Sequence, residues 1–83
     1  IETLYRLMDD KVEALEFKVK DDSAILNTPI KELKIKGGIL IVGIIRPGKK
    51  TVIPSGDDII MKGDKVIVLS YENRITRLSD ILR

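Results

Sequence analysis

The sequence predicts an α+β fold, in which a small, mostly antiparallel β-sheet or open barrel-like core carries a short helix after its first strand and a C-terminal helix. Two short, β-branched apolar runs, residues 39–45 and 66–69, are bounded by Gly, Pro, Ser or Asp and predict central strands. Neither run alternates with polar residues, so we expect both faces of these strands to be covered. In so small a chain, a second copy could supply part of that cover.

The first twenty residues show two different periodicities. Four apolar residues recur at the helical spacing i, i+3, i+4 and i+7, namely Ile1, Leu4, Tyr5 and Met8. This spacing predicts a short helix that ends at Asp9 and Asp10. Residues 11–20 alternate instead, with Leu15, Phe17 and Val19 on one face, and predict a strand with one exposed face.

A short helix is predicted after this strand. Thr28 can cap its first turn, and Pro29 suits the first helical position because proline has no N–H to leave unpaired. Ile30 and Leu33 share one face of this helix. The pair Gly37 and Gly38 then supplies the exit into the central strand.

Turn signals divide the second half of the chain. Pro47 and Gly48 fit the corners of a type II turn, which would pair residues 41–46 with residues 49–53 in a hairpin. Residues 59–61 predict a further short strand before the turn at residues 62–64. Residues 72–82 predict the C-terminal helix, capped by Ser70, with one apolar stripe: Ile75, Leu78 and Leu82.

Composition excludes several classes of function. The chain has 15 Lys and Arg against 13 Asp and Glu, and no apolar run approaches the roughly 20 residues that span a bilayer. It contains neither Cys nor His, which removes disulfides, thiolate catalysis, the usual zinc sites and histidine acid–base chemistry. We therefore expect no enzyme, no metal site and no membrane insertion.

Two charged clusters offer weaker signals. Asp57, Asp58 and Asp64 could converge on a cation, but Asp beside Gly is typical of tight turns, which is the favoured interpretation. The second cluster surrounds the Pro47–Gly48 turn and could contact an anion or nucleic acid, or form an ordinary solvated hairpin tip: Arg46, Lys49 and Lys50. With only three aromatic residues available for base stacking, nucleic-acid binding is the less favoured alternative.

The chain resembles the TrkA C-terminal domain, also called the RCK C-terminal domain. The resemblance rests on VEALEFKV, TPIKEL, IVGIIRPGKKTVIPSGDDIIMKGDKVIVLS and ITRLSDIL, and it covers nearly everything from Lys11 onward. It implies that residues 11–83 form this regulatory domain. Residues 1–10 would then be the end of a linker helix from a missing upstream nucleotide-binding domain, and the chain a fragment of a longer cytoplasmic protein.

The resemblance also implies a function. Such domains sense ligands and form homodimers in cytoplasmic subunits that control membrane potassium transporters, at the inner face of the cell membrane. Attachment to another ion or solute transporter is the alternative. No cofactor is implied within this domain, because nucleotide is expected only in the upstream one.

Some members bind cyclic di-AMP in a cleft shared by two copies. The corresponding ligand-binding or dimer cleft in this sequence is Ile30, Leu33, Ile35, Lys36, Gly38 and Ile39. The cyclic di-AMP binders carry an Ile-Arg pair and a longer connection there, whereas this chain has Ile35 and Lys36 followed at once by the two glycines. Lysine lacks the fork of arginine donors, so this departure counts against cyclic di-AMP.

Overall fold

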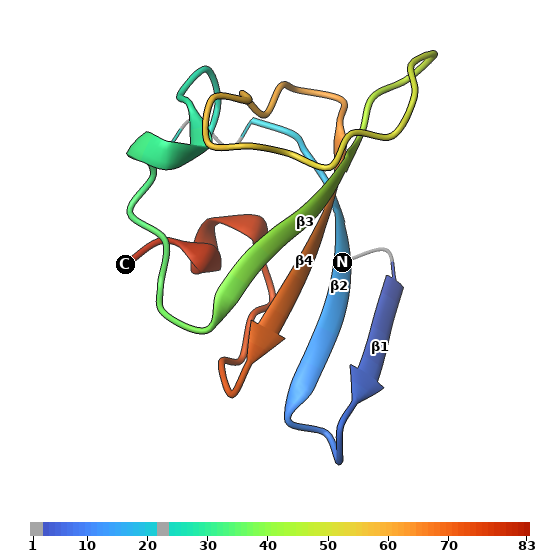
Figure 1. Ribbon diagram of the computed structural model, residues 1–83, viewed down its shortest axis with the longest axis vertical. Coiled ribbons are helices and arrows are strands. Elements are labelled where there is room, and N and C mark those ends of the chain that lie inside the picture. The colour runs from blue at the N-terminus through green and yellow to red at the C-terminus, as the bar shows by residue number, and fades with distance from the viewer. Residues whose placement is uncertain (1–2, 22–23) are drawn as a thin grey trace.

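A four-stranded antiparallel sheet with strand order β1-β2-β4-β3 forms the body of the chain (Figure 1). The computed structural model describes residues 3–21 and 24–83. Its strands are β1 (Thr3–Leu7), β2 (Val12–Lys18), β3 (Ile39–Ile45) and β4 (Lys65–Tyr71). Two short 3₁₀ turns accompany them, η1 (Ile30–Glu32) and η2 (Leu78–Ile81).

The three strands with the strongest sequence signals are confirmed. Strand β2 buries Leu15 and Phe17, as its alternation predicts, and β4 buries Val66 and Val68 on the same side of the sheet. The C-terminal segment closes over this inner face with its own buried side chains, Ile75, Leu78 and Ile81. The opposite, outer face keeps exposed apolar residues. We expected both faces of the central strands to be covered, but the described residues cover only the inner one.

The predicted α+β class is wrong. The mostly antiparallel sheet is present, but the described residues form no α-helix, only the 3₁₀ turns η1 and η2. At η1, the backbone N–H groups of Ile30 and Lys31 donate to Asp58 and Gly56 rather than to helix carbonyls. Thr28 caps nothing, because its hydroxyl donates to the Leu26 carbonyl. Pairing with a distant segment therefore replaces the expected helix.

The C-terminal helix is also replaced by extended chain. Arg77 and Leu82 on either side of η2 have extended backbones, and Leu82 bridges Ile35. Ser70 is not the cap, since its hydroxyl donates to the Asn73 carbonyl inside the bend that follows β4. Of the three residues of the predicted stripe, Ile75 and Leu78 are buried in the core, and Leu82 is half-buried against it.

The predicted N-terminal helix is a strand. Residues 3–7 pair with β2, and Ile1, the first residue of the predicted helical stripe, lies outside the described residues. The connection to β2 uses Met8, Asp9 and Asp10 at positive φ, a conformation that Asp adopts more readily than most residues. Pairing along β2 therefore overrides the helical spacing.

The predicted hairpin after β3 is partly correct. Lys49 N–H donates to the Arg46 carbonyl across the Pro47–Gly48 corner, and Gly48 has the positive φ that a type II turn requires. Beyond the turn, pairing is limited to one bridge, between Ile44 and Val52. Residues 59–61 likewise form only a single bridge instead of a strand, between Ile59 and Pro29.

No helix among residues 3–21 and 24–83 is long and apolar enough to cross a membrane.

Candidate ligand cleft

A cleft of about 250 Å³ lies beside the start of β3, between the η1 region and the turn at residues 54–56. Its floor and walls are mostly apolar, with one ammonium group and one hydroxyl among them. The lining residues are Ile30, Ile35, Lys36, Ile39, Leu40, Ile41, Pro54, Ser55 and Gly56.

One wall of the cleft is fixed by hydrogen bonds between segments far apart in sequence. Ile30 N–H donates to the Asp58 carbonyl at 2.9 Å, and Lys31 N–H donates to the Gly56 carbonyl at 2.9 Å. The Asp58 carboxylate in turn accepts from the Ser55 N–H at 2.7 Å, which holds the turn at residues 55–58. These bonds set the position of Ser55 at the mouth of the cleft.

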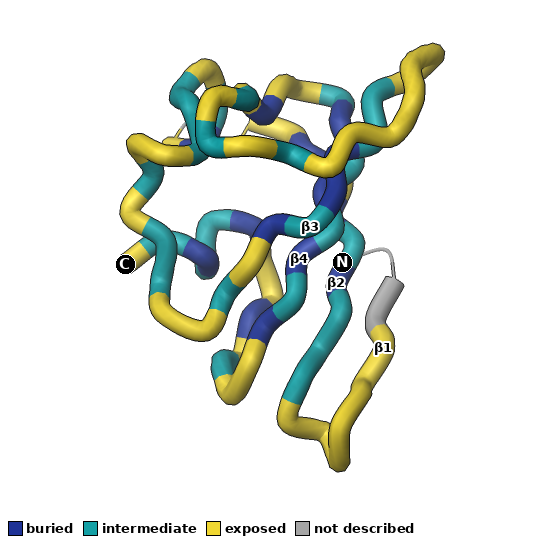
Figure 2. Tube along the Cα trace, in the orientation of Figure 1, coloured by how far each residue is buried: buried dark blue, intermediate teal, exposed yellow. Residues whose placement is uncertain are grey.

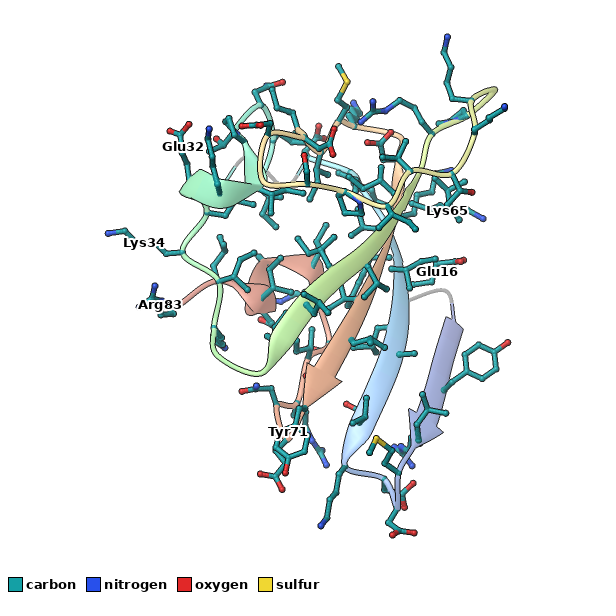
Figure 3. The ribbon with its side chains drawn as sticks, viewed as in Figure 1. Glu16, Glu32, Lys34, Lys65, Tyr71 and Arg83 are labelled. Atoms are coloured by element: carbon teal, nitrogen blue, oxygen red, sulfur yellow. The ribbon has the colours of Figure 1, made fainter. Side chains whose placement is uncertain are left out.

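The other wall is fixed by the end of the chain. Lys36 N–H donates to the Ile81 carbonyl at 2.8 Å, and Ile35 bridges Leu82. Lys36 is therefore held at the cleft by its backbone. Figure 3 shows Lys34 and Arg83, its neighbours on this edge, pointing away from the body of the domain.

The chemistry of the cleft suits a small ligand with an apolar or flat body and an anionic group. Isoleucine, leucine and proline side chains supply apolar contact, while the half-buried Lys36 supplies a positive charge. The Ser55 hydroxyl already donates to the Asp58 carboxylate at 3.3 Å and accepts from the Asp57 N–H at 3.4 Å, so toward a ligand it can only accept. A lysine is a point charge with three donors, so it attracts an anion without imposing a planar, two-pronged geometry.

Four of the six residues that the sequence singles out line this cleft together: Ile30, Ile35, Lys36 and Ile39. The other two lie elsewhere, since Leu33 packs against the core and Gly38 lies against the Tyr71 carbonyl and Asn73. Ligand binding by these residues stays a prediction.

Sequence reasoning missed the part of the first wall that is formed by Pro54, Ser55 and Gly56. It identified these residues as a turn, but nothing in their spacing indicates that the turn docks on η1. The bonds from Ile30 and Lys31 that bring them there join backbone groups, which leave no signature in side-chain type.

Arg46, one of the three proposed anion contacts, is occupied by a carboxylate of the same chain. Its Nε and Nη2 donate to the two carboxylate oxygens of Asp64 at 2.9 Å each, and Nη2 also donates to the Ile59 carbonyl at 2.9 Å. Lys49 and Lys50 remain exposed at the hairpin tip. The Arg46–Asp64 ion pair therefore links the end of β3 to the turn before β4.

The Arg46–Asp64 ion pair shifts the pKa of both partners. Burial of Asp64 opposes its negative charge, but hydrogen bonds from Arg46 and from the Met61 N–H, with the charge of Arg46, outweigh burial and lower the pKa of Asp64. The hydrogen bond to Asp64 raises the pKa of Arg46 in return. A doubly bonded pair of this kind is held charged at neutral pH.

The acidic residues do not converge on a cation site. Asp64 binds Arg46, Asp57 pairs with Lys31 at 2.7 Å, and Asp58 holds the Ser55 turn. Among the residues that the structure describes, no group of three or more His, Cys, Asp or Glu side chains could hold a metal ion. Turn chemistry, the interpretation favoured from the sequence, accounts for Asp58.

A wider depression of about 400 Å³ opens at the far end of the sheet but is a weaker candidate. Its charges are mixed, and two of them pair directly, Arg6 Nε with Glu13 Oε2 at 3.5 Å. It is lined by Arg6, Asp10, Lys11, Glu13, Glu72, Asn73 and Arg74. Alternating charges favour neither an anion nor a cation, so the apolar cleft with its single lysine is the better site.

Comparison with known proteins identifies the family. Residues 14–83 match the TrkA-C domain. The chain belongs to the TrkA-C domain family. The match begins within β2, so it takes in β3, β4, both 3₁₀ turns and the whole cleft, while β1 lies outside it.

Individual relatives agree with this assignment. The chain is 36% identical over 70 residues to the Trk system potassium uptake protein TrkA homolog 1 of Methanosarcina mazei. It is 31% identical over 70 residues to a TrkA homolog of Pyrococcus abyssi. Each alignment covers 84% of this chain, but only 15% and 31% of the respective relative. The chain thus corresponds to a small part of each of these proteins.

Proposed function

We propose that this chain is a non-enzymatic regulatory domain that senses a ligand, forms a homodimer and controls a potassium transporter. The observation that carries the proposal is the TrkA-C match over residues 14–83. Its relatives are named as Trk potassium uptake proteins, and the chain aligns with a small share of their length. This small share of the relatives' length accords with a regulatory domain in a cytoplasmic subunit at the inner face of the membrane.

The cleft beside β3 is the proposed sensing site. Lys36 supplies the positive charge for the ligand's anionic group, and Ile30, Ile35 and Ile39 supply apolar contact to its body. Both walls depend on hydrogen bonds between distant segments, those of Ile30 and Lys36. A ligand that contacts both walls would therefore favour one relative placement of these segments, which gives binding a way to bias the rest of the domain.

A domain exchange tests the regulatory role. The matched 70 residues of the M. mazei relative are replaced by the corresponding residues of this chain, and potassium uptake is measured in a strain that depends on that relative. We expect uptake to be restored to the level of the intact relative, whereas deletion of the matched segment lowers it. Uptake equal to that of the deletion would contradict the proposal.

A matched pair of variants locates the effect. Lys36→Ala in the exchanged segment removes the cleft charge, while Lys34→Ala removes an exposed lysine two residues away. The proposal expects the first substitution to alter the regulation of uptake and the second to leave it unchanged.

A further inference from the structure

Seven of the 15 Lys and Arg residues of the chain lie at one end of the sheet. Lys18, at the end of β2, is directly opposite Lys65 at the start of β4, and Lys65 is opposite Ile45 at the end of β3. The hairpin of residues 46–53 projects beyond this end (Figure 1). We call this region the basic end, and its cationic residues are Lys18, Lys20, Arg46, Lys49, Lys50, Lys62 and Lys65.

The carboxylates near the basic end do not neutralise it. Among the described residues there are four, and each already has a partner: Glu16 with Lys65, Asp21 with Lys62, Asp58 with Ser55, and Asp64 with Arg46. The side chains of Lys18, Lys49 and Lys50 have no ion pair or hydrogen bond within the described part of the chain. The basic end therefore keeps an excess of positive charge.

The opposite end of the sheet has the reverse balance. Three cations, Arg6, Lys11 and Arg74, lie there with four carboxylates: Asp9, Asp10, Glu13 and Glu72. Charge is thus separated along the strands, although the whole chain carries a formal charge of only +2. Such a separation orients the domain with its basic end toward an anionic surface.

Stability of the fold does not explain this crowding of positive charge. Lys18 and Lys65 are directly opposed on neighbouring strands, where like charges destabilise a sheet. Lys49 and Lys50 are adjacent at an exposed hairpin tip. An anionic partner would turn this repulsion into attraction, so the basic end has the character of a binding surface.

Exposed aliphatic side chains accompany the lysines. Ile53 on the hairpin is 87% exposed, and Figure 2 shows the projecting hairpin coloured as exposed. Met61 is 49% exposed and lies beside the Arg46–Asp64 ion pair, because its N–H donates to Asp64. Lysines interspersed with aliphatic side chains are typical of protein surfaces that lie at the boundary between lipid headgroups and acyl chains.

A nucleic acid fits the basic end less well. Proteins that bind single strands without sequence preference stack the bases on aromatic side chains. Phe17 is buried in the core, Tyr71 lies at the far end of β4, and Tyr5 lies on the edge strand β1. The basic end thus offers aliphatic contacts and no aromatic ones, which favours lipid as its partner.

We propose that the basic end of the sheet binds the anionic headgroups of a lipid bilayer surface. The inference rests on the proposed role at the inner face of the membrane, and it names the part of the domain that contacts the lipid. Each lysine near an anionic bilayer strengthens binding about fivefold. Lys18, Lys49 and Lys50 therefore give a weak, reversible contact, which attachment to a membrane transporter would reinforce.

Co-sedimentation of the 83-residue chain with lipid vesicles tests the proposal. Vesicles of phosphatidylcholine mixed with phosphatidylglycerol present anionic headgroups, and vesicles of phosphatidylcholine alone do not. Lys49→Glu with Lys50→Glu reverses the charge of the hairpin tip, while Lys11→Glu with Arg74→Glu makes the same change in net charge at the opposite end. We expect the tip variant to weaken binding to anionic vesicles at least about tenfold, and the control less than about threefold.

Equal binding to the two kinds of vesicle, or equal weakening by the two double variants, would overturn the proposal. Tighter binding to a short DNA duplex than to anionic vesicles at the same salt concentration would also overturn it, and would assign the basic end to nucleic acid. If circular dichroism shows that the tip variant does not fold, Lys18→Glu compared with Lys11→Glu decides in the same way. A chain that ignores vesicles but restores potassium uptake in the domain exchange overturns only this inference, whereas failure in the exchange overturns the proposed function.

Discussion

Asp64 is a carboxylate in the interior of the fold, with only 1% of the residue exposed. A buried charge is costly unless it is paired and hydrogen-bonded, and Asp64 accepts from two nitrogens of Arg46 and from the Met61 N–H. The two bonds from Arg46 tie the end of β3 to the turn that leads into β4, and the bond from Met61 lies within that turn. The pair therefore acts on the packing of the central strands.

Removing the charge of Asp64 should destabilise the fold. In Asp64→Asn the amide cannot reproduce a bidentate contact with Arg46, so we expect a loss of about 2–3 kcal/mol in the free energy of unfolding. The value lies below the usual range for broken buried pairs because 36% of the Arg46 side chain is exposed and can be hydrated. Urea denaturation measures the loss. Asp57→Asn, which breaks the exposed pair with Lys31, is the control and should cost less than about 0.5 kcal/mol.

Acid should destabilise the chain through the same carboxylate and one other. Hydrogen bonds donated by the backbone of Thr76 and Arg77 lower the pKa of Asp80, and the pKa of Asp64 is also lowered. A carboxyl group whose folded pKa lies below its unfolded value stabilises the fold above the unfolded pKa, and that contribution is lost as pH falls through the folded pKa.

We therefore expect the free energy of unfolding to change little between about pH 7 and 5 and to fall below about pH 4. Urea titrations at a series of pH values measure it. Asp64→Asn should show a shallower fall than the wild type, and identical slopes for the two proteins would contradict the assignment to Asp64.

At the scale of elements, β2, β3 and β4 could be predicted from sequence, whereas β1 was predicted as a helix and the other two predicted helices are only 3₁₀ turns. Residues 39–45 and 66–69 are apolar and β-branched throughout, so local composition and burial agree. The apolar spacing of residues 75–82 also suits a helix, but the Ile81 carbonyl accepts from the Lys36 N–H and the Arg83 N–H donates to the Lys34 carbonyl, both across the molecule. Such long-range backbone bonds have no local signature, which is why periodicity failed at both ends of the chain.

The junction between β3 and β4 depends on one glycine of the adjacent pair. Gly38 has φ of +81°, and a Cβ there would lie 2.9 Å from the Tyr71 carbonyl oxygen, whereas a Cβ on Gly37 would meet nothing within 4 Å. We expect Gly38→Ala to lower the free energy of unfolding by about 1–3 kcal/mol, because both the backbone and the contact are unfavourable. Gly37→Ala should lie within about 0.5 kcal/mol of wild type. Denaturation curves of the two variants provide the comparison, and equal stabilities would count against this geometry.

At the scale of the whole molecule, the family resemblance located four of the nine residues that line the cleft. Ile30, Ile35, Lys36 and Ile39 were singled out from the sequence and lie together. The turn at residues 54–56 was missed because its contact with η1 joins segments more than twenty residues apart through backbone atoms. The Arg46–Asp64 ion pair was also missed, because the two residues lie 18 positions apart and the sequence around either one does not indicate the other.

The central claim is that the cleft beside β3 senses a ligand through Lys36, and isothermal titration calorimetry tests it most directly. The probes are cyclic di-AMP and AMP, which combine flat bases with phosphate, titrated into wild type, Lys36→Ala and Lys34→Ala. The account predicts that the wild type binds at least one probe, that Lys36→Ala weakens binding at least about tenfold, and that Lys34→Ala does not. Absence of binding by the wild type, or equal loss in the two variants, would contradict it.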